Sequence, residues 1–274
     1  MKLGIFWLGT SVYKNYFDEF SKSLTNLFPN GEFEKELVIL SDGLQEYDGK
    51  QMFGCNVQTI EIIDYPYPLV TANKFQTVSH YMKKLNLDYG VFFDSDTIIL
   101  EKSPEFWKSL KEKIISGKIL CSSHPHYLYD RNYVIHPFLR IHNEFSKAYV
   151  DHTIIDSNKS YIISSFFAGS YKIITEYADK IYKMLGADLT SLRWMPNCVD
   201  EAYFNKIYVD EAISEGHTNM LKEPYITMNP YFHVGSHERS NENIYENNFP
   251  ECDTIFMNQK YNLEIKNIKK TNQI

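Results

Sequence analysis

The stretch Tyr89–Leu100 constrains the fold of this chain more than any other. It reads YGVFFDSDTIIL, an apolar and aromatic run followed by two aspartates that flank one serine. A short apolar run bounded by polar residues predicts a buried strand of an α/β sheet. Asp94 and Asp96 then stand where the strand ends, and open α/β sheets bind their ligands at that edge.

The two aspartates have the spacing of a metal site. In an extended chain the side chains of Asp94 and Asp96 point to the same side, so both can reach one hard cation through oxygen atoms. A divalent metal held there could neutralise a diphosphate. The alternative is a solvated turn, because a D-x-D triplet alone also occurs by chance.

The rest of the chain alternates between strand-like and helical patterns. Helical spacing of apolar residues covers 13–27, 75–85, 104–110, 173–185 and the segment around Asp200. Strand-like runs cover 3–8, 37–40, 57–63, 119–122 and 161–167, and Ala168–Ser170 has the composition of a turn. Strands that alternate with helices predict an α/β fold with a largely parallel sheet.

Two regions lack this periodicity. Residues 124–158 are rich in His and Tyr and are predicted to form a long loop, and long loops near a ligand edge are often functional. From about residue 240 the chain is polar and rich in Asn, which favours a mobile tail. Because no internal repeat or linker divides the sequence, we expect a single domain over 1–274.

Composition excludes some classes of function. The chain has 274 residues, of which 43% are hydrophobic, and this is enough to bury the core of one large domain. Its net charge is -7 and it contains no long basic run, so a nucleic-acid partner is not expected. The apolar run Leu3–Leu8 is too short to span a membrane and is not followed by a signal-peptide cleavage site. We therefore expect a cytoplasmic protein without a membrane span.

The cysteines favour the same compartment. Cys55, Cys121, Cys198 and Cys252 are widely scattered and form no C-x-x-C pair. This spacing fits neither a zinc site nor a disulfide framework. Reduced, mostly buried thiols are the expected state.

Five short motifs occur in a recognisable order along the chain. They are Asp88-Tyr89 leading into Phe92–Asp96, then Ser123–Tyr127, Ala148-Tyr149, Phe166–Ser170, and Asp200-Glu201 with Asn205-Lys206. Together they resemble glycosyltransferase family 6, the retaining transferases that include the blood-group A and B enzymes. The resemblance implies the GT-A glycosyltransferase fold, in which a Rossmann-like nucleotide-sugar half is merged with an acceptor-binding half.

The resemblance also implies a reaction. Galactose or N-acetylgalactosamine would move from a UDP-sugar to a galactose-containing glycan acceptor, with an α-1,3 linkage and retained configuration. The cofactor would be Mn2+, or Mg2+, and would bridge Asp94 and Asp96 to the donor diphosphate.

The acidic pair Asp200-Glu201 receives the catalytic roles. By resemblance, Glu201 is the carboxylate beneath the anomeric carbon, where it serves as nucleophile or as electrostatic stabiliser of a cationic transition state. Asp200 would orient a sugar hydroxyl. The alternative is structural, because Asp and Glu at the start of a helix are ordinary caps that complement the helix dipole.

Further residues are assigned to the donor site by the same resemblance. Tyr13 would pack on uracil, Lys74 would lie near the donor, and His124 would lie close to the transferred sugar. Phe6, Trp7 and Leu8 would line the nucleoside pocket, and Ser95 would belong to the cofactor-binding site. Tyr161, Ile163 and Ser165 would determine which donor and acceptor groups the enzyme accepts. Core packing is the plain alternative for Tyr13 and Ile163, and a solvated side chain is the alternative for Lys74.

Two departures from family 6 leave other readings open. Cys198-Val199 stands where the family has Trp-His against the acceptor, so the acceptor is uncertain. The segment Phe232–Arg239 resembles the end motif of family 8, in which case His233 or His237 would join the metal. The alternatives are a family 8-like UDP-galactose or UDP-glucose transferase and a non-catalytic nucleotide-sugar-binding protein. A phosphatase of the haloacid-dehalogenase kind is a further alternative, because such enzymes also place D-x-D after a hydrophobic strand, although generally on the first strand of the chain. The oligomeric state stays open.

Overall fold

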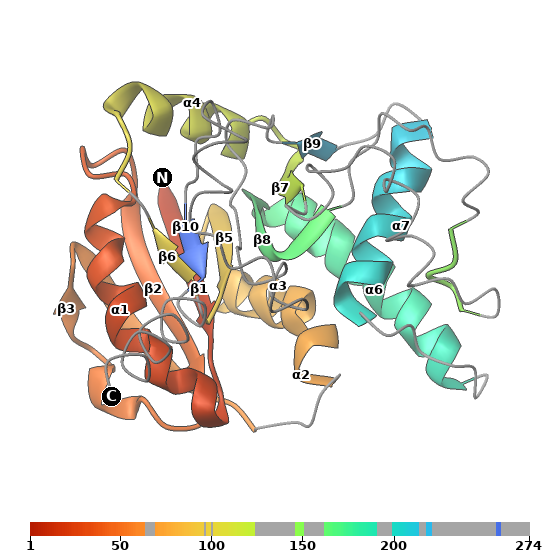
Figure 1. Ribbon diagram of the computed structural model, residues 1–274, viewed down its shortest axis with the longest axis horizontal. Coiled ribbons are helices and arrows are strands. Elements are labelled where there is room, and N and C mark those ends of the chain that lie inside the picture. Colours follow the sequence, from red (N-terminus) through yellow and green to blue (C-terminus); the bar gives the residue numbers. More distant parts are fainter. Residues whose placement is uncertain are drawn as a thin grey trace, which may run out of the picture.

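A computed structural model describes residues 1–63, 69–95, 97–99, 101–123, 146–150, 162–190, 199–213, 218–220 and 256–258. In these ranges a central sheet carries helices on both faces (Figure 1). The strands of this sheet are β1 (Lys2–Leu8), β2 (Glu34–Ser41), β3 (Gln51–Met52), β4 (Cys55–Glu61), β5 (Tyr89–Asp94), β7 (Ile119–Ser123), β8 (Ile162–Ser170) and β9 (Thr218–Met220). The α-helices are α1 (Phe17–Ser23), α2 (Leu69–Ala72), α3 (Lys74–Lys84), α4 (Pro104–Ile114), α6 (Tyr171–Thr190) and α7 (Val199–Ile213).

The sheet confirms the predicted α/β class, but it is not as largely parallel as the sequence predicted. Its order is β3-β4-β2-β1-β5-β8-β7-β9. Strands β4, β2, β1 and β5 are parallel, as predicted, whereas β8 runs antiparallel to both β5 and β7. The sheet is therefore mixed. Its parallel half has a Rossmann-like strand order: β2 and β4 follow β1 on one side, and the chain then returns to place β5 on the other side of β1, so the order reverses between β1 and β5 although the two strands run parallel. Ligands of such sheets bind outside the carboxyl ends of the strands at this reversal.

Both faces of the parallel half are buried, which explains the continuous apolar runs of its strands. Along β1 the side chains alternate between two cores. Ile5 and Trp7 pack with residues of α1 and α4 on one face, whereas Phe6 packs with residues of α3, α6 and α7 on the other. Figure 1 shows α1 on one side of the sheet and α6 with α7 beside β7 and β8.

The turn predicted at Ala168–Ser170 was wrong. These residues continue β8 and pair with β5, where Ser170 lies opposite Tyr89 and Gly169 lies opposite Gly90. Long-range pairing overrode the local turn composition, because β5 offers backbone groups that would otherwise stay unpaired in the core. A Cβ atom on Gly169 would approach the Cγ2 of Ile173 to 2.6 Å, so this glycine lets α6 start directly against the sheet.

The helix predicted over 13–27 is divided into three pieces. A 3-10 helix, η1 (Ser11–Tyr16), precedes α1, and a second one, η2 (Leu24–Asn26), follows it. The Ser23 hydroxyl donates to the Phe20 carbonyl and accepts the Ile99 N–H. The end of α1 is thereby tied to β6 (Thr97–Ile99), the strand that follows the D-S-D triplet.

One strand lies in the region predicted to be a mobile tail. β10 (Phe256–Asn258) pairs antiparallel with β6 in a separate two-stranded sheet (Figure 1). The remainder of that tail and the loop predicted at 124–145 and 151–158 lie outside the described residues. Of the helices within the described ranges, none combines the length and apolar character that a bilayer crossing requires.

Candidate functional site

The end of β5 lies at the reversal point of the sheet. Asp94 is the last residue of β5 and pairs with Leu8, the last residue of β1. Its side chain is 38% exposed, so the carboxylate reaches the surface of the carboxyl edge. The buried Trp7 indole N–H donates to the Ser95 carbonyl at 3.1 Å. This hydrogen bond anchors the backbone of the D-S-D triplet to the buried Trp7 indole.

Lys74 connects this strand end to a distant helix. Its side chain is only 2% exposed, and its Nζ lies 2.5 Å from Asp200 Oδ2 and 3.6 Å from Asp94 Oδ1. Nζ also lies 5.1 Å from the centre of the Phe92 ring, which forms an apolar floor beneath the charge. The alternative of a solvated lysine is therefore wrong.

Lys74 carries its charge despite complete burial. Burial by itself lowers the pKa of the ammonium group, but the carboxylates of Asp200, Asp94 and Glu201 outweigh it, and the net pKa is raised. A buried charge is tolerated when it is paired and hydrogen-bonded. The cluster therefore joins one cation on α3 to acidic side chains from two other elements, β5 and α7.

Asp200 and Glu201 lie in the first turn of α7. Asp200 is 7% exposed and pairs with Lys74. The Glu201 Oε2 accepts the backbone N–H of Ser164, on β8, at 3.3 Å. Both carboxylates thus contact other elements, so they do more than an ordinary pair of helix caps would do.

An irregularity in β8 makes the Glu201 contact available. Cys121 of β7 lies opposite Phe167, but the next residue, Ser122, lies opposite Ile163. The intervening residues of β8 bulge out of the β7 ladder, and Ser164 is among them. Bulges free backbone groups and re-aim side chains, and they are common beside functional sites. Here the freed N–H of Ser164 binds the carboxylate.

Asn205 fixes α7 against the same strand. Its Oδ1 accepts the N–H of Ile162, and its Nδ2 donates to the carbonyls of Ile162 and Glu201, each at 2.8 Å. Asn205 is fully buried. The Asn205 side chain therefore fixes both the position of α7 along β8 and the rotation of α7 about its own axis.

A cavity of about 480 Å³ opens beside Lys74. Its walls come from the carboxyl ends of the parallel strands and from the exposed face of α3. The lining residues are Leu8, Leu40, Ile62, Ile63, Asn73, Lys74, Gln76, Thr77, His80 and Tyr81. Apolar walls with a few polar groups are typical of small-molecule sites.

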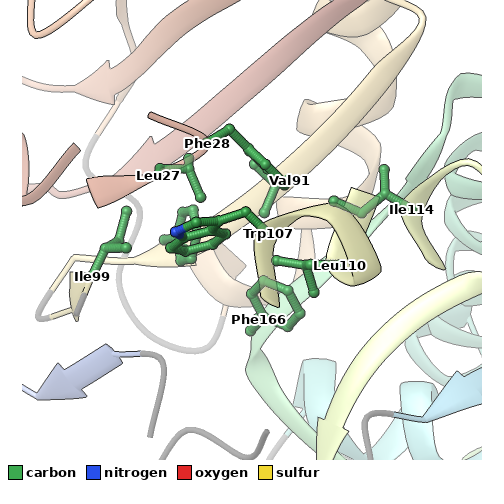
Figure 2. A pocket seen from close by; sticks show the side chains of 9 residues that line it. Leu27, Phe28, Val91, Ile99, Trp107, Leu110, Ile114 and Phe166 are labelled. Atoms are coloured by element: carbon green, nitrogen blue, oxygen red, sulfur yellow. The ribbon is translucent and has the colours of Figure 1, made fainter. Parts of the chain in front are cut away.

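A second, enclosed cavity of about 10 Å³ lies in the core between α4 and the sheet. Figure 2 shows apolar side chains around it, with the Trp107 indole in their midst. The Trp107 Nε1 is buried and has no hydrogen-bond partner among the described residues. The space is far too small for a substrate, so it is a packing defect of the core.

The structure brings four of the predicted site residues together: Asp94, Lys74, Asp200 and Glu201. Leu8 lines the large cavity, whereas the side chains of Phe6 and Trp7 are buried in the two cores. Tyr13 is 44% exposed on η1, so it is not a core residue.

The remaining predicted site residues lie on β8 or outside the described residues. Ser165 is half-buried on β8 within the bulge, and Ile163 lies on the same strand. Asp96, His124 and Tyr161 lie outside the described residues, as do His233 and His237. Among the residues that are described, no three His, Cys, Asp or Glu side chains form a ready metal cluster.

The chain matches no protein-family model. Over 144 residues it is 28% identical to the O-antigen biosynthesis glycosyltransferase WbnI of Escherichia coli. The chain is thus similar to a glycosyltransferase. The match spans 52% of this chain and 57% of that relative, little more than half the length of each. It supports the predicted transferase class, while membership of family 6 stays a prediction.

Two features of the site have no signal in the sequence. Ser164 acts through its backbone N–H, which any residue other than proline provides, and Trp7 acts as a support beneath the triplet. The charge cluster was partly foreseeable, because the resemblance to family 6 had already assigned Lys74 and each of the three acids to the site. Their contact was not foreseeable, since it depends on how α3, β5 and α7 meet.

Proposed function

We propose that this chain is a retaining glycosyltransferase of the GT-A type. It transfers galactose or N-acetylgalactosamine from a UDP-sugar to a galactose-containing glycan, by an α-1,3 linkage and with Mn2+ or Mg2+. The supporting observation is the ion cluster in which Lys74 links Asp94, at the end of β5, to Asp200 on α7. This cluster joins a strand end suited to a diphosphate with a helix suited to sugar chemistry.

The acidic strand end fits a hard divalent cation. Mn2+ and Mg2+ prefer oxygen ligands, and the Asp94 carboxylate is accessible at the end of β5. Asp94 would hold the metal together with Asp96. When bound, the metal would neutralise charge on the departing UDP.

The chain's own residues would do the rest. Lys74 holds Asp200 in place through their ion pair, so that an oxygen of Asp200 can accept a hydrogen bond from a hydroxyl of the sugar. Glu201, held by the Ser164 N–H, places negative charge where the anomeric carbon becomes cationic as its bond to UDP breaks. The acceptor hydroxyl oxygen would then form the new bond to the anomeric carbon on the same face and give its proton to the departing UDP phosphate.

The large cavity beside Lys74 suits the nucleoside. It is lined by Leu8 at the end of β1 and by Tyr81 on α3, whereas Tyr13 is not among its lining residues. Aromatic and aliphatic surfaces stack well on a nucleobase, and polar groups on α3 can bind its edge or the ribose. This placement supports the nucleoside assignment of Leu8 only, because the side chains of Phe6 and Trp7 are buried in the two cores and do not line the cavity.

The function is tested by UDP release from a panel of UDP-sugars, with and without a galactoside acceptor, in Mn2+ and in EDTA. We expect release from UDP-galactose or UDP-N-acetylgalactosamine that increases with acceptor and is lost in EDTA. Binding of UDP without release from any donor would favour the nucleotide-sugar-binding protein. Release without stereochemical retention in the product would overturn the retaining assignment.

Glu201→Gln tests the catalytic role directly. This change removes the charge and keeps the size of the side chain, so we expect turnover to fall by roughly a hundredfold or more while UDP affinity changes less than about threefold. The control is Glu176→Gln, which changes an exposed glutamate on α6 and should leave both values unaltered. Equal loss of affinity and turnover in Glu201→Gln would mark Glu201 as a structural residue.

A further inference from the structure

Asp188 is a fully buried carboxylate outside the charge cluster described above. It lies in the last turn of α6, and its exposed fraction is 0%. Burying a carboxylate is costly unless hydrogen bonds replace the lost water. The contacts of Asp188 therefore indicate what its position achieves.

Three donors from two other parts of the chain converge on Asp188. The Ser146 hydroxyl donates to Oδ2 at 2.6 Å, and the Lys147 N–H lies 2.8 Å from Oδ1 and 3.0 Å from Oδ2. From α7, the Tyr203 hydroxyl donates to Oδ2 at 2.7 Å. The same carboxylate oxygen thus binds segment 146–150 and helix α7.

The chemistry of this junction requires a carboxylate. Its donors are hydroxyl and amide groups that all point inward, and a carboxylate is the side chain that accepts several of them at once. Burial and the neighbouring Asp188 raise the pKa of Tyr203, so its hydroxyl stays a donor. The Ser146 hydroxyl oxygen in turn accepts the N–H of Ala148.

The junction lies close in sequence to the proposed catalytic acids. Tyr203 follows Asp200 and Glu201 in the first turns of α7. Asn205 and Glu201 attach the helix to β8 on one side, and Tyr203 attaches it to α6 on another. Two anchors on different sides define the rotation of a helix, which one anchor alone would leave free.

We propose that Asp188 is a positioning residue. It holds the first turns of α7 and segment 146–150 to each other through one shared acceptor, and so sets the orientation in which Asp200 and Glu201 face the site. The effect of Asp188 on catalysis rests on the proposed function, whereas its coupling of α7 to segment 146–150 does not.

The test is a reciprocal pair of single-atom deletions. Tyr203→Phe removes the donor on α7, and Ser146→Ala removes the donor on the other segment. Tyr208→Phe is the matched control, because it removes a hydroxyl from the same helix at a position that packs against the same core. Thermal melting first shows that each variant is folded, and amide hydrogen exchange is then followed for peptides covering 146–150 and 199–206.

We expect each deletion to speed amide hydrogen exchange in the segment on the opposite side of the junction. Tyr203→Phe should speed exchange in 146–150, and Ser146→Ala should speed exchange in 199–206, each by about tenfold, while Tyr208→Phe changes neither. The double variant should show less than the sum of the two effects, because the residues share one partner. Strictly local changes in both single variants would overturn the proposal.

Turnover distinguishes this proposal from the proposed function. In an active enzyme, Tyr203→Phe should lower kcat about tenfold while the Kd for UDP changes less than about twofold, since the donor diphosphate site lies on β5. A wild-type protein without turnover would contradict the proposed function, and the exchange experiment would still decide the coupling. Full kcat in a Tyr203→Phe variant with fast exchange would limit Asp188 to a structural role.

Discussion

Lys74 is the residue on which the site depends most. A lysine that is almost completely buried needs carboxylates around it, and here they come from α7 and β5. Removing one partner of a buried ion pair leaves the other charge uncompensated, which costs more than the pair itself contributes. The Lys74 side chain therefore links the stability of the fold to the geometry of the proposed site.

Lys74→Met should be strongly destabilising. We expect a loss of about 3–5 kcal/mol in the free energy of unfolding at pH 7, because Asp200 would be left buried without its cation. Urea unfolding measures this loss. The control is Lys180→Met, which breaks the half-exposed pair with Glu176 on α6 and should cost less than about 1 kcal/mol. Similar small losses in both variants would show that the Lys74 charge is not needed for stability.

The pH dependence of this effect follows from the pKa of Lys74. Because the folded state raises that pKa above its ordinary value of 10.5, the stabilisation is fully present below pH 10.5 and is lost as the pH rises through the folded pKa. The difference in unfolding free energy between wild type and Lys74→Met should therefore be the same at pH 7 and pH 9. A difference that already shrinks between these two values would contradict a raised pKa.

At the scale of elements, α4 is specified locally. Pro104 occupies the first turn and the preceding Ser103 caps the helix, its Oγ accepting the N–H of Phe106 at 3.3 Å. These are the residue types that start helices, and they are visible in the sequence. The predicted start of this helix was accordingly confirmed.

Ser103→Ala should remove this cap. We expect a loss of about 1 kcal/mol in the free energy of unfolding, because one N–H of the first turn loses its acceptor. Ser103→Asp retains an acceptor oxygen and should stay within about 0.5 kcal/mol of wild type. Urea unfolding of the two variants tests the cap, and equal losses in both would mean that the bond contributes nothing.

The β8 strand shows the opposite behaviour at the same scale. Its end was predicted too early because Ala168–Ser170 has turn composition, and its bulge around Ser164 was not predicted. Both features arise from pairing with β5 and β7, which lie far away in the chain. Local composition cannot encode which backbone groups a distant strand will offer.

At the scale of the whole molecule, the sheet separates two cores and shields the cysteines that the structure describes. Cys55 and Cys121 are both buried free thiols. Burial raises the pKa of Cys55 to about 11 and that of Cys121 higher still, so almost no thiolate is present at neutral pH. The thiolate is the reactive form.

Neither Cys55 nor Cys121 should react with a thiol reagent in the native protein at pH 8. Peptide mapping by mass spectrometry after labelling measures this, and labelling in urea is the control in which both should react. Labelling of Cys121 in the native state within minutes would indicate that the core beside β7 opens far more often than its packing implies.

The α/β class, the strand that ends at Asp94, most helices and the acidic start of α7 could all be predicted from the amino-acid sequence. These features follow from hydrophobic period and end signals, which are properties of neighbouring residues. The sequence also marked Lys74 and Glu201 as candidates. Three contacts could not be predicted in this way: the burial of Lys74 between Asp94 and Asp200, the hydrogen bond from the β8 bulge to Glu201, and the junction at which Asp188 joins α7 to segment 146–150. Those contacts depend on elements distant in the chain, and the free energy of a buried charge is set by what surrounds it rather than by its position in the sequence.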